Sequence, residues 1–408
     1  MHETKYRPRT FLHHGVLDDI ARFLPSQPLA FLIASPTIRQ VVEHIHCESL
    51  LMSAVALCGG KKPREWEEWS LQNGAWCGHV SNLKCTLWWI RRLANANKGK
   101  LAALSFAWRS FIADLTDVKD LSGLRWLFLP EASVLNKTLN PLASCVTLER
   151  LWLRSCRGLT RVESLCHLHS LKSLDLSMTG MTDDGLCALA ACRALEEVDL
   201  SGCAFICAIP FLKGMEHLRV VKVRDSGVTD RAISVLSTAA GLLHLDISGC
   251  ILVTSLNPLR ELKNLQWLNA TWCGVRDESI EGISCCSALE YLNVSRCWDI
   301  HNVNALGALQ RLQVLDLRGT NVDDDGIVGL SRCESLSILH LGGCFYIFSV
   351  AALAVMSNLK ELDLSHTSVA EESLSLLPSW VHLVKKPSRI ISRNTSLMCL
   401  ETRRVSHH

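Results

Sequence analysis

The chain has 408 residues, with 42 basic against 40 acidic residues and a formal net charge of +2. This balance gives no electrostatic reason to expect nucleic acid or a membrane surface as the main partner. Hydrophobic residues make up 48% of the chain. However, the densest apolar run, at residues 50–58, is far shorter than the roughly 18 residues of a spanning helix. Residues 1–9 carry charge with no apolar segment behind them, so we expect no signal peptide.

Residues 1–46 carry the pattern of three short helices. Apolar residues recur at helical spacing over residues 16–24, and prolines at 25 and 28 end this helix. A second apolar helix is predicted over residues 29–34. Ser35 and Pro36 then supply the N-cap and first-turn proline of a third, which runs to about residue 45. Three helices of this size bury little core by themselves, so we expect them either to cap a neighbouring apolar surface or to bind another protein.

Residues 47–100 form a tryptophan-rich segment that also contains two basic pairs. The tryptophans are Trp66, Trp69, Trp76, Trp88 and Trp89. Interleaved aromatic and basic residues can stack nucleic-acid bases. The other interpretation, which we favour, is that this segment packs on the structure that follows it and completes an N-terminal cap.

Residues 101–384 repeat one phrase, Leu-x-x-Leu-x-Leu-x-x, with Cys, Thr or Ser at its ninth position. The copies begin at Leu101, Leu124, Leu148, Leu171, Leu195, Leu218, Leu242, Leu265, Leu289, Leu312, Leu336 and Leu359. Successive starts are alternately 23 and 24 residues apart, so the structural unit is a pair of copies, 47 residues long. We call the two kinds short and long copies. The long copies begin at Leu124, Leu171, Leu218, Leu265, Leu312 and, by the same alternation, Leu359.

Each phrase predicts a short strand with one buried face, because its apolar residues alternate with polar ones. Stacking about twelve copies places these strands side by side in a parallel sheet on the inner face of an arc. The small ninth residue is expected to hydrogen-bond the neighbouring turn. Long copies continue with Thr182, Thr229 or Asp323, which can cap a short outer helix. Short copies contain Pro210 or Pro258, and we expect a looser or 3₁₀ turn there.

The phrase resembles the cysteine-containing leucine-rich repeats, and the helices of residues 12–46 resemble the F-box that precedes such repeats in substrate receptors of SCF ubiquitin ligases. The resemblance implies an α/β horseshoe solenoid with a small helical N-terminal cap, no catalysis of its own, and a protein partner on the concave face. It also implies an adaptor-binding surface on the N-terminal helices, formed by Leu17, Ile20, Leu24, Pro25, Leu29, Ile33 and Ile38. Similar repeats also regulate signalling enzymes such as adenylate cyclases and small GTPases, which is the alternative function.

Ten of the nineteen cysteines in the chain lie at fixed positions of the repeat. Six occupy the ninth phrase position: Cys156, Cys203, Cys250, Cys273, Cys297 and Cys344. Four more lie three residues before the first leucine of short copies: Cys145, Cys192, Cys286 and Cys333. Because no Cys-x-x-Cys pair occurs, the spacing predicts neither a zinc site nor a disulfide framework. Reduced, buried thiols indicate a cytoplasmic protein, with the nucleus as the other compartment.

The x positions of the phrase have no structural duty, and most hold small polar or charged residues. Exceptions cluster in two places. Position three of six consecutive copies holds Val220, His244, Trp267, Tyr291, Val314 and Ile338, flanked by Arg224 and Arg318, with Trp272 and Trp298 at the turn edge. A second cluster nearer the N-terminus comprises Trp126, Phe128, Trp152 and Arg154. Aromatic residues beside arginine dominate protein–protein interfaces, so we predict partner binding at both clusters.

No catalytic, cofactor or metal residue is predicted, because no nucleotide, hydrolase or metalloprotease motif occurs. Position five does hold a column of carboxylates: Asp175, Asp199, Asp246, Asp316 and Asp363. Such a ladder could bind cations, but we expect its members to be exposed on separate strands, as ordinary solvated surface. Residues 385–408 form a basic tail, expected to be either disordered or a weak nuclear-localisation signal.

Overall fold

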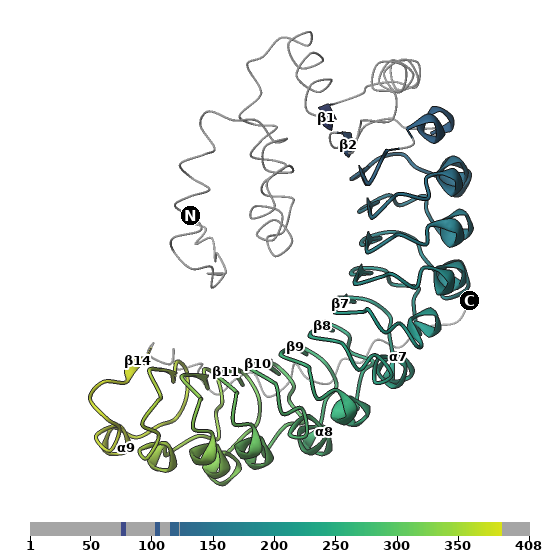
Figure 1. The fold of residues 1–408 in the computed structure, drawn as a ribbon. Helices are drawn as coiled ribbons and strands as arrows, with labels where there is room; N and C mark the ends of the chain where they lie inside the picture. The colour runs from purple at the N-terminus through teal and green to yellow at the C-terminus, as the bar shows by residue number, and fades with distance from the viewer. Residues whose placement is uncertain (1–74, 79–102, 107–114, 122, 386–408) are drawn as a thin grey trace, which may run out of the picture.

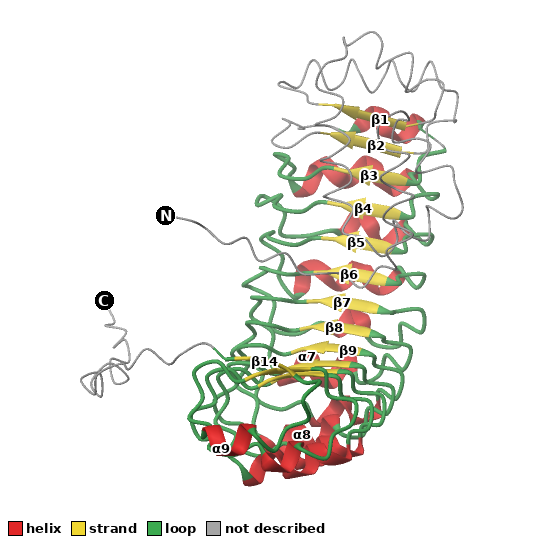
Figure 2. Ribbon diagram, turned by 90° about the vertical axis from the view of Figure 1, so that its left-hand side faces the viewer, coloured by secondary structure: helices red, strands yellow, loops and turns green. Residues whose placement is uncertain are grey.

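The computed structural model describes residues 75–78, 103–106, 115–121 and 123–385. Within them, 14 strands form one parallel sheet whose order follows the chain from β1 to β14. The strands line the inner side of an arc and the helices its outer side (Figure 1), and seen from the concave side the strands stack as successive rungs (Figure 2). The predicted horseshoe solenoid with a parallel concave sheet is therefore confirmed.

The elements are short and alternate strictly between strand and helix after β2. The strands are β1 (Ala75–Gly78), β2 (Ala103–Phe106), β3 (Trp126–Phe128), β4 (Arg150–Trp152), β5 (Ser173–Asp175), β6 (Glu197–Asp199), β7 (Val220–Lys222), β8 (His244–Asp246), β9 (Trp267–Asn269), β10 (Tyr291–Asn293), β11 (Val314–Asp316), β12 (Ile338–His340), β13 (Glu361–Asp363) and β14 (His382–Val384). The 3₁₀ helices are η1 (Thr116–Asp120), η2 (Asn136–Ser144), η3 (Glu163–His167), η4 (Asp184–Ala191), η5 (Pro210–Leu212), η6 (Asn257–Glu261), η7 (Asn304–Ala308), η8 (Asp325–Arg332) and η9 (Ala351–Leu353). The α-helices are α7 (Asp230–Leu236), α8 (Asp277–Ile283) and α9 (Glu371–Leu374).

Strands β2 to β13 correspond one to one to the twelve predicted copies. The sheet is longer than the phrase by one strand at each end, because β1 pairs with β2 and β14 with β13. Strand β1 lies inside the segment of residues 47–100 that we expected to act as a cap. The predicted N-terminal helices, most of that segment and the tail after residue 385 lie outside the described residues, so these boundaries stay predictions.

The core runs along the whole array between sheet and helices. Positions one, four and six of the phrase point into it, as Leu171, Leu174 and Leu176 show with at most 1% of their surface exposed. The same positions are buried in every copy from Leu124 to Leu359. Since each strand has only three or four residues, these side chains are covered mainly by the copies on either side, which is the general condition of repeat arrays.

A ladder of thiols runs through this core. The Sγ of Cys203 donates to the carbonyl of Leu176 in the preceding copy at 3.2 Å, and all six ninth-position cysteines make the equivalent bond. The hydroxyl of Thr179 instead donates to Leu176 in its own copy, at 2.6 Å. The predicted bond to a neighbouring turn is therefore confirmed for cysteine and wrong for this hydroxyl. Burial raises the pKa of Cys156 to about 12, so such a thiol keeps the proton it donates.

The outer segments differ between long and short copies, as the sequence predicted. Short copies carry 3₁₀ turns of three to five residues, with Pro210 and Pro258 in the first turns of η5 and η6. Five long copies carry helices of seven to nine residues, whereas α9 in the Leu359 copy has four. The caps expected at Thr182, Thr229 and Asp323 are present. The amide of Gly185 donates to Thr182 Oγ1, and that of Gly326 to Asp323 Oδ1.

Some of these longer helices are 3₁₀ rather than α. In η4, a Cβ on Gly185 would lie 2.0 Å from the carbonyl oxygen of Thr160. The glycine lets the segment press directly against the preceding copy, whose Val162 amide donates to the Gly185 carbonyl at 3.1 Å. In α7 the same position is Ala232 and in α8 it is Ser279, and both of those segments are α-helical.

A side-chain carboxylate, or in one copy the amide oxygen of an asparagine, ties the long copies that begin at Leu124, Leu171, Leu218, Leu265 and Leu312 to the short copies that follow them. Asp183 Oδ1 accepts hydrogen bonds from the amides of Cys207 and Ala208, at 2.9 and 3.2 Å. The equivalent acceptors recur every 47 residues and are Asn136, Asp230, Asp277 and Asp324. The 47-residue unit is thus fixed by hydrogen bonds as well as by length.

The carboxylate column at position five is not the exposed ladder that we expected. Asp246 and Asp316 are buried, and the others are half-buried. Each side chain folds back over its own turn: Asp175 Oδ1 accepts from the amide of Ser177 at 2.8 Å and from its hydroxyl at 2.6 Å. Because the carboxylates satisfy turn amides, their role in the fold is to cap the end of the strand.

We predict that Asp230→Ala lowers the free energy of unfolding by about 1 kcal/mol, because the amides of Thr254 and Ser255 lose their acceptor. Asp230→Asn should cost much less, since Asn136 performs this role with an amide oxygen. Urea denaturation followed by circular dichroism measures both variants. Equal losses for the two variants would contradict the role given to the acceptor oxygen.

We also predict that Asp175→Asn stabilises the fold at neutral pH. Burial and the neighbouring Asp199 raise the pKa of Asp175 to about 6, so ionisation of this carboxyl destabilises the folded state as the pH rises through that value. An asparagine keeps the cap, as Asn269 does with Thr271. The expected gain is roughly 1–2 kcal/mol at pH 7.5, falling toward zero near pH 4.

The control is Asp175→Ala, which removes both the charge and the cap and should gain less than the asparagine variant at pH 7.5. The same urea titrations at several pH values provide the comparison. A pH-independent gain for Asp175→Asn would show that the carboxyl is not strained by its ionisation.

Candidate functional site

The predicted row at position three forms a continuous strip on the concave sheet. Its members face one another in direct register across six neighbouring strands: Val220, His244, Trp267, Tyr291, Val314 and Ile338. All of them are half-buried. Each side chain therefore contacts its neighbours along the strip and still presents part of its surface to the concave side.

The centre of this strip is a stack of three rings. The centroids of His244 and Trp267 are 3.9 Å apart with an interplanar angle of 4°, and those of Trp267 and Tyr291 are 4.9 Å apart at 7°. Both faces of the Trp267 ring are thus covered by aromatic neighbours. What the stack offers to a ligand is its ring edges, which carry the positive part of the aromatic quadrupole. Such a surface favours hydrogen-bond acceptors and disfavours a base that would need an open ring face.

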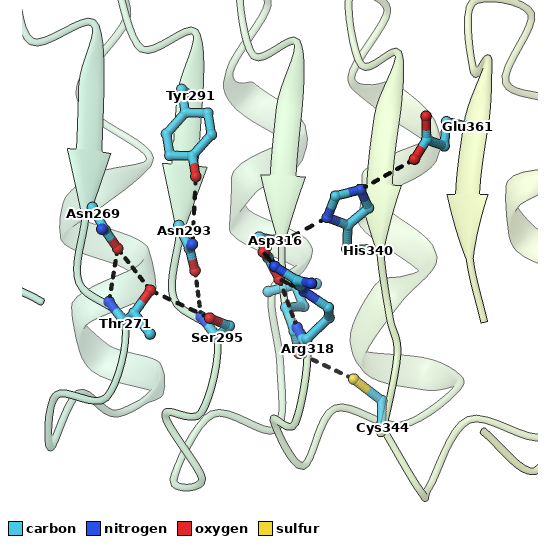
Figure 3. A network of polar contacts seen from close by, with 11 residues as sticks. Asn269, Thr271, Tyr291, Asn293, Ser295, Asp316, Arg318, His340, Cys344 and Glu361 are labelled. Atoms are coloured by element: carbon cyan, nitrogen blue, oxygen red, sulfur yellow. Dashed lines mark hydrogen bonds and ion pairs between the residues drawn. The ribbon is translucent and has the colours of Figure 1, made fainter. Parts of the chain in front are cut away.

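Amide and hydroxyl groups lie at positions five and seven of the copies that carry Trp267 and Tyr291, and Figure 3 shows them below the ring of Tyr291. Asn269 Oδ1 accepts from the amide and hydroxyl of Thr271, and Asn293 Oδ1 accepts from the amide of Ser295. The Nδ2 of Asn293 reaches the hydroxyl of Tyr291 at 3.4 Å. This second row ties the orientation of the ring to the turn beneath it.

A charged network adjoins the rings on the C-terminal side. The Nε and Nη2 of Arg318 both donate to the buried carboxylate of Asp316. His340 lies between two carboxylates, with Nδ1 3.6 Å from Asp316 and Nε2 3.6 Å from Glu361 (Figure 3). At these distances the contacts are electrostatic rather than hydrogen bonds.

The network shifts the pKa values of His340 and Asp316 in opposite directions, and each shift favours the charged form of its group. The interaction with Asp316 raises the pKa of His340 against the effect of burial. Burial raises the pKa of Asp316, but His340 and Arg318 outweigh it and hold that pKa below its ordinary value. The carboxylate is therefore ionised at neutral pH, and the adjoining surface carries a fixed ion pair rather than a free arginine.

The other predicted flank is also paired. Arg224 lies 3.7 Å from the buried carboxylate of Asp246, with more than half of its side chain exposed. Next to it, Lys222 forms an ion pair with Glu197 at 2.9 Å. Because both predicted arginines contact a buried carboxylate, each guanidinium is held in place by its own side of the site before any partner arrives.

Trp272 lies at position eight, where the chain leaves the sheet. Its φ of +61° falls in the left-handed region, as does that of every residue at this position from Glu131 to His366. Arg296, one copy later, places its guanidinium 5.1 Å from the Trp272 ring. The two side chains form an exposed aromatic–cationic pair at the edge of the concave face.

The N-terminal cluster is only partly available for binding. Trp126 and Trp152 are half-buried and Arg154 is exposed, but Phe128 has 5% of its surface exposed. Phe128 packs edge-on against Trp152, with centroids 4.5 Å apart, and Trp126 is covered by Arg150 at 5.4 Å. The expectation that Phe128 contacts a partner is therefore wrong, because its neighbours use that surface for packing.

Several residues of the concave site were not predicted from the sequence. They are Arg150, Asn269, Asn293, Arg296, His340 and Glu361. Position five could have indicated the asparagines and His340, since it shares a strand with position three of the same copy. The predicted adaptor-binding residues from Leu17 to Ile38 lie outside the described part of the chain.

No group of three or more His, Cys, Asp or Glu side chains in residues 115–121 and 123–385 is arranged to hold a metal ion. None of the helices in the described part of the chain has the length and apolar character of a membrane span. The chemistry of the concave site is that of recognition by rings, amides and ion pairs.

Comparisons with known proteins agree with this architecture. Residues 167–190 and 309–331 match the family described as Leucine Rich repeat. No curated protein sequence matches the chain significantly. Among solved structures, an internalin from Listeria monocytogenes is 23% identical, with a TM-score of 0.59 over 67% of this chain and 76% of its own.

Two further structures share the fold. A leucine-rich-repeat protein of Leptospira interrogans is 15% identical, with a TM-score of 0.60 over 72% of this chain and 80% of its own. The ectodomain of the receptor kinase GASSHO1/SCHENGEN3 from Arabidopsis thaliana, in complex with CASPARIAN STRIP INTEGRITY FACTOR 2, is 18% identical. Its TM-score is 0.51, over 76% of this chain and 40% of its own. From its repeated phrase, its 14-stranded parallel sheet and these matches, the chain has the fold of leucine-rich-repeat proteins.

Proposed function

We propose that this protein is a non-enzymatic binding protein whose concave face holds a protein partner across strands β7 to β12. The observation that carries the proposal is the ring stack of His244, Trp267 and Tyr291, aligned in register and bordered by ion pairs on both sides. Rings and arginines that are half-exposed and already fixed lose little conformational entropy on binding, which is the usual property of interface hot spots.

The chemistry of the site favours an acceptor-rich segment of a protein. Ring edges carry positive partial charge, and the exposed parts of Arg224 and Arg318 add donors at the two ends. One of the similar structures, the plant receptor ectodomain, was solved in complex with CASPARIAN STRIP INTEGRITY FACTOR 2. We expect the partner segment to contribute backbone carbonyls or carboxylates toward the strip.

In its more specific form, the proposal is that the chain is a substrate receptor of an SCF ubiquitin ligase in the cytoplasm or nucleus. The order of the helices predicted in residues 12–46 supports it, together with their position before the repeats. The thiols of the described residues are free, which suits a reducing compartment. The alternative is a regulator of a signalling enzyme, for which the concave site would be the same and the N-terminal helices only a cap.

We predict that Trp267→Ala together with Tyr291→Ala weakens binding of the partner by more than about 1 kcal/mol, because the strip loses its central rings. The partner is first identified by affinity purification with the full chain, and its Kd is then measured by calorimetry. Glu281→Ala on the outer helix α8 is the matched control and should bind as the unaltered protein does. Equal affinity for the double variant, with an unchanged circular dichroism spectrum, would place the site elsewhere.

The adaptor hypothesis makes a separate prediction. The full chain should co-purify with an SCF adaptor, and Leu29→Asp with Ile33→Asp should abolish this while leaving the concave partner bound. If the full chain never retains an adaptor, the ubiquitin-ligase form of the proposal is wrong. A stoichiometric complex with a signalling enzyme that survives deletion of residues 12–46 would support the alternative instead.

A further inference from the structure

A second surface, separate from the concave site, carries a row of exposed apolar side chains. It lies just beyond the strands, where the chain turns from the sheet toward the helices. The row, which we call the lateral ridge, consists of Phe205, Ile251, Leu252, Trp298, Phe345 and Tyr346. These side chains have between 54% and 70% of their surface exposed. A single exposed apolar residue is ordinary, but a periodic row of them marks a contact surface.

The ridge arises from the difference between long and short copies. In a short copy, two residues separate the ninth position from the next buried residue, as between Cys203 and Ile206. A long copy has only one residue at this place, such as Gly227 between Ser226 and Val228. A Cβ on Gly227 would lie 2.5 Å from the carbonyl oxygen of Ala204, so there is no room for a larger side chain. The apolar side chains therefore project on every second copy. The residues at the intervening positions are Gly227, Gly274 and the larger Asn321. The row ends toward the N-terminus at Arg157, which occupies the equivalent position in the Leu148 copy.

Carboxylates border the ridge along its whole length. The carboxylates that tie long copies to short ones, which we call the clamp residues, belong to Asp183, Asp230, Asp277 and Asp324. They accept hydrogen bonds from backbone amides of the ridge-bearing copies, within a few residues of the apolar side chains. Exposed acids lie beside them: Asp184, Glu278, Asp299, Asp323 and Asp325. Asp323 also forms a β-bridge with Tyr346 of the ridge itself.

Few cations offset this charge. Arg276 pairs with Asp299 at 3.5 Å. Between residues 179 and 349, Arg231 and His301 are the other basic residues in the segments that run from the ninth position of a copy into the first turn of its outer helix. The border is therefore negative, which disfavours nucleic acid and anionic membranes as the occupant. It is complementary to an apolar surface flanked by lysine or arginine.

The spacing of the ridge indicates the shape of that occupant. Neighbouring strands lie about 4.8 Å apart, so residues on every second copy recur at roughly 10 Å. An α-helix rises about 1.5 Å per residue and so advances roughly 10.5 Å in seven residues. A helix lying along the ridge could thus place one apolar residue in register with each of the four ridge-bearing copies.

We propose that the lateral ridge docks an amphipathic α-helix of a partner protein, with apolar residues seven positions apart and lysine or arginine along the flank that faces Asp184, Glu278 and Asp325. This site does not share residues with the concave strip. The protein therefore has two docking surfaces, and a partner helix on the ridge leaves the concave face open.

The test uses the full chain and a displayed library of 24-residue amphipathic helices. The library has a fixed apolar stripe with a seven-residue period, and its flanking positions are randomised among Lys, Arg, Glu, Gln and Ser. The ridge variant carries Trp298→Ser, Phe345→Ser and Tyr346→Ser. Because these side chains are exposed, the variant should fold, and its circular dichroism spectrum and thermal transition verify this.

We expect selected helices to be enriched in Lys and Arg at the flank and to bind the ridge variant at least tenfold more weakly than the unaltered chain. Glu278→Gln with Asp325→Asn should weaken the same helices several-fold. The concave variant, Trp267→Ala with Tyr291→Ala, should bind them unchanged, which separates this proposal from the concave one. Failure of either site leaves the other standing.

Three results would overturn the proposal. The first is that no selected helix distinguishes the unaltered chain from the ridge variant. The second is that the selected flanks show no excess of basic residues, which would remove the charge argument. The third is a dimer in sedimentation velocity that the ridge variant converts to a monomer, which would make a second copy of this chain the occupant.

Discussion

The structure depends on the contact between successive copies. Each strand has three or four residues and each outer helix at most nine, so no copy can bury its leucines alone. Stacking buries positions one, four and six along one continuous core and pairs every strand from β2 to β13 with two neighbours. The thiol ladder and the carboxylate clamps add hydrogen bonds in the same direction, from each copy to the next. Stability is therefore a property of the array rather than of any segment.

The same stacking creates the concave site. Residues 23 or 24 positions apart in the chain become direct neighbours across the sheet, so that His244, Trp267 and Tyr291 meet face to face. Strand pairing continues through the turn, where the amide of Trp272 donates to Ser295 of the next copy. This bond holds Trp272 at positive φ, in a conformation that such a bulky residue rarely adopts. The site is rigid because its backbone is fixed from both sides.

The alternation of copy length gives the molecule two unlike surfaces. On the concave face long and short copies both contribute, and the position-three residues of strands β7 to β12 form a continuous strip with amides and paired charges beside it. On the lateral face only the short copies carry projecting apolar side chains. The long copies between them have no projecting apolar side chain at that position, and their acidic residues border the row. Short copies have one more residue than long copies between the ninth position and the next buried residue. This difference produces a periodic pattern that a uniform repeat would lack.

The sequence by itself determined the phrase, its alternation, the buried leucines and cysteines, and the row of position-three residues, because these follow from which side of a strand each residue occupies. It could not determine which of those residues remain available. Phe128 is lost to packing by Trp152, Arg318 is held by Asp316, and the carboxylates of position five turn back onto their own turns. It also gave no indication that the carboxylate of Asp183 accepts a hydrogen bond from an amide 24 residues further along the chain. These outcomes depend on side-chain partners in neighbouring copies, whose distances are fixed only when the strands are in register.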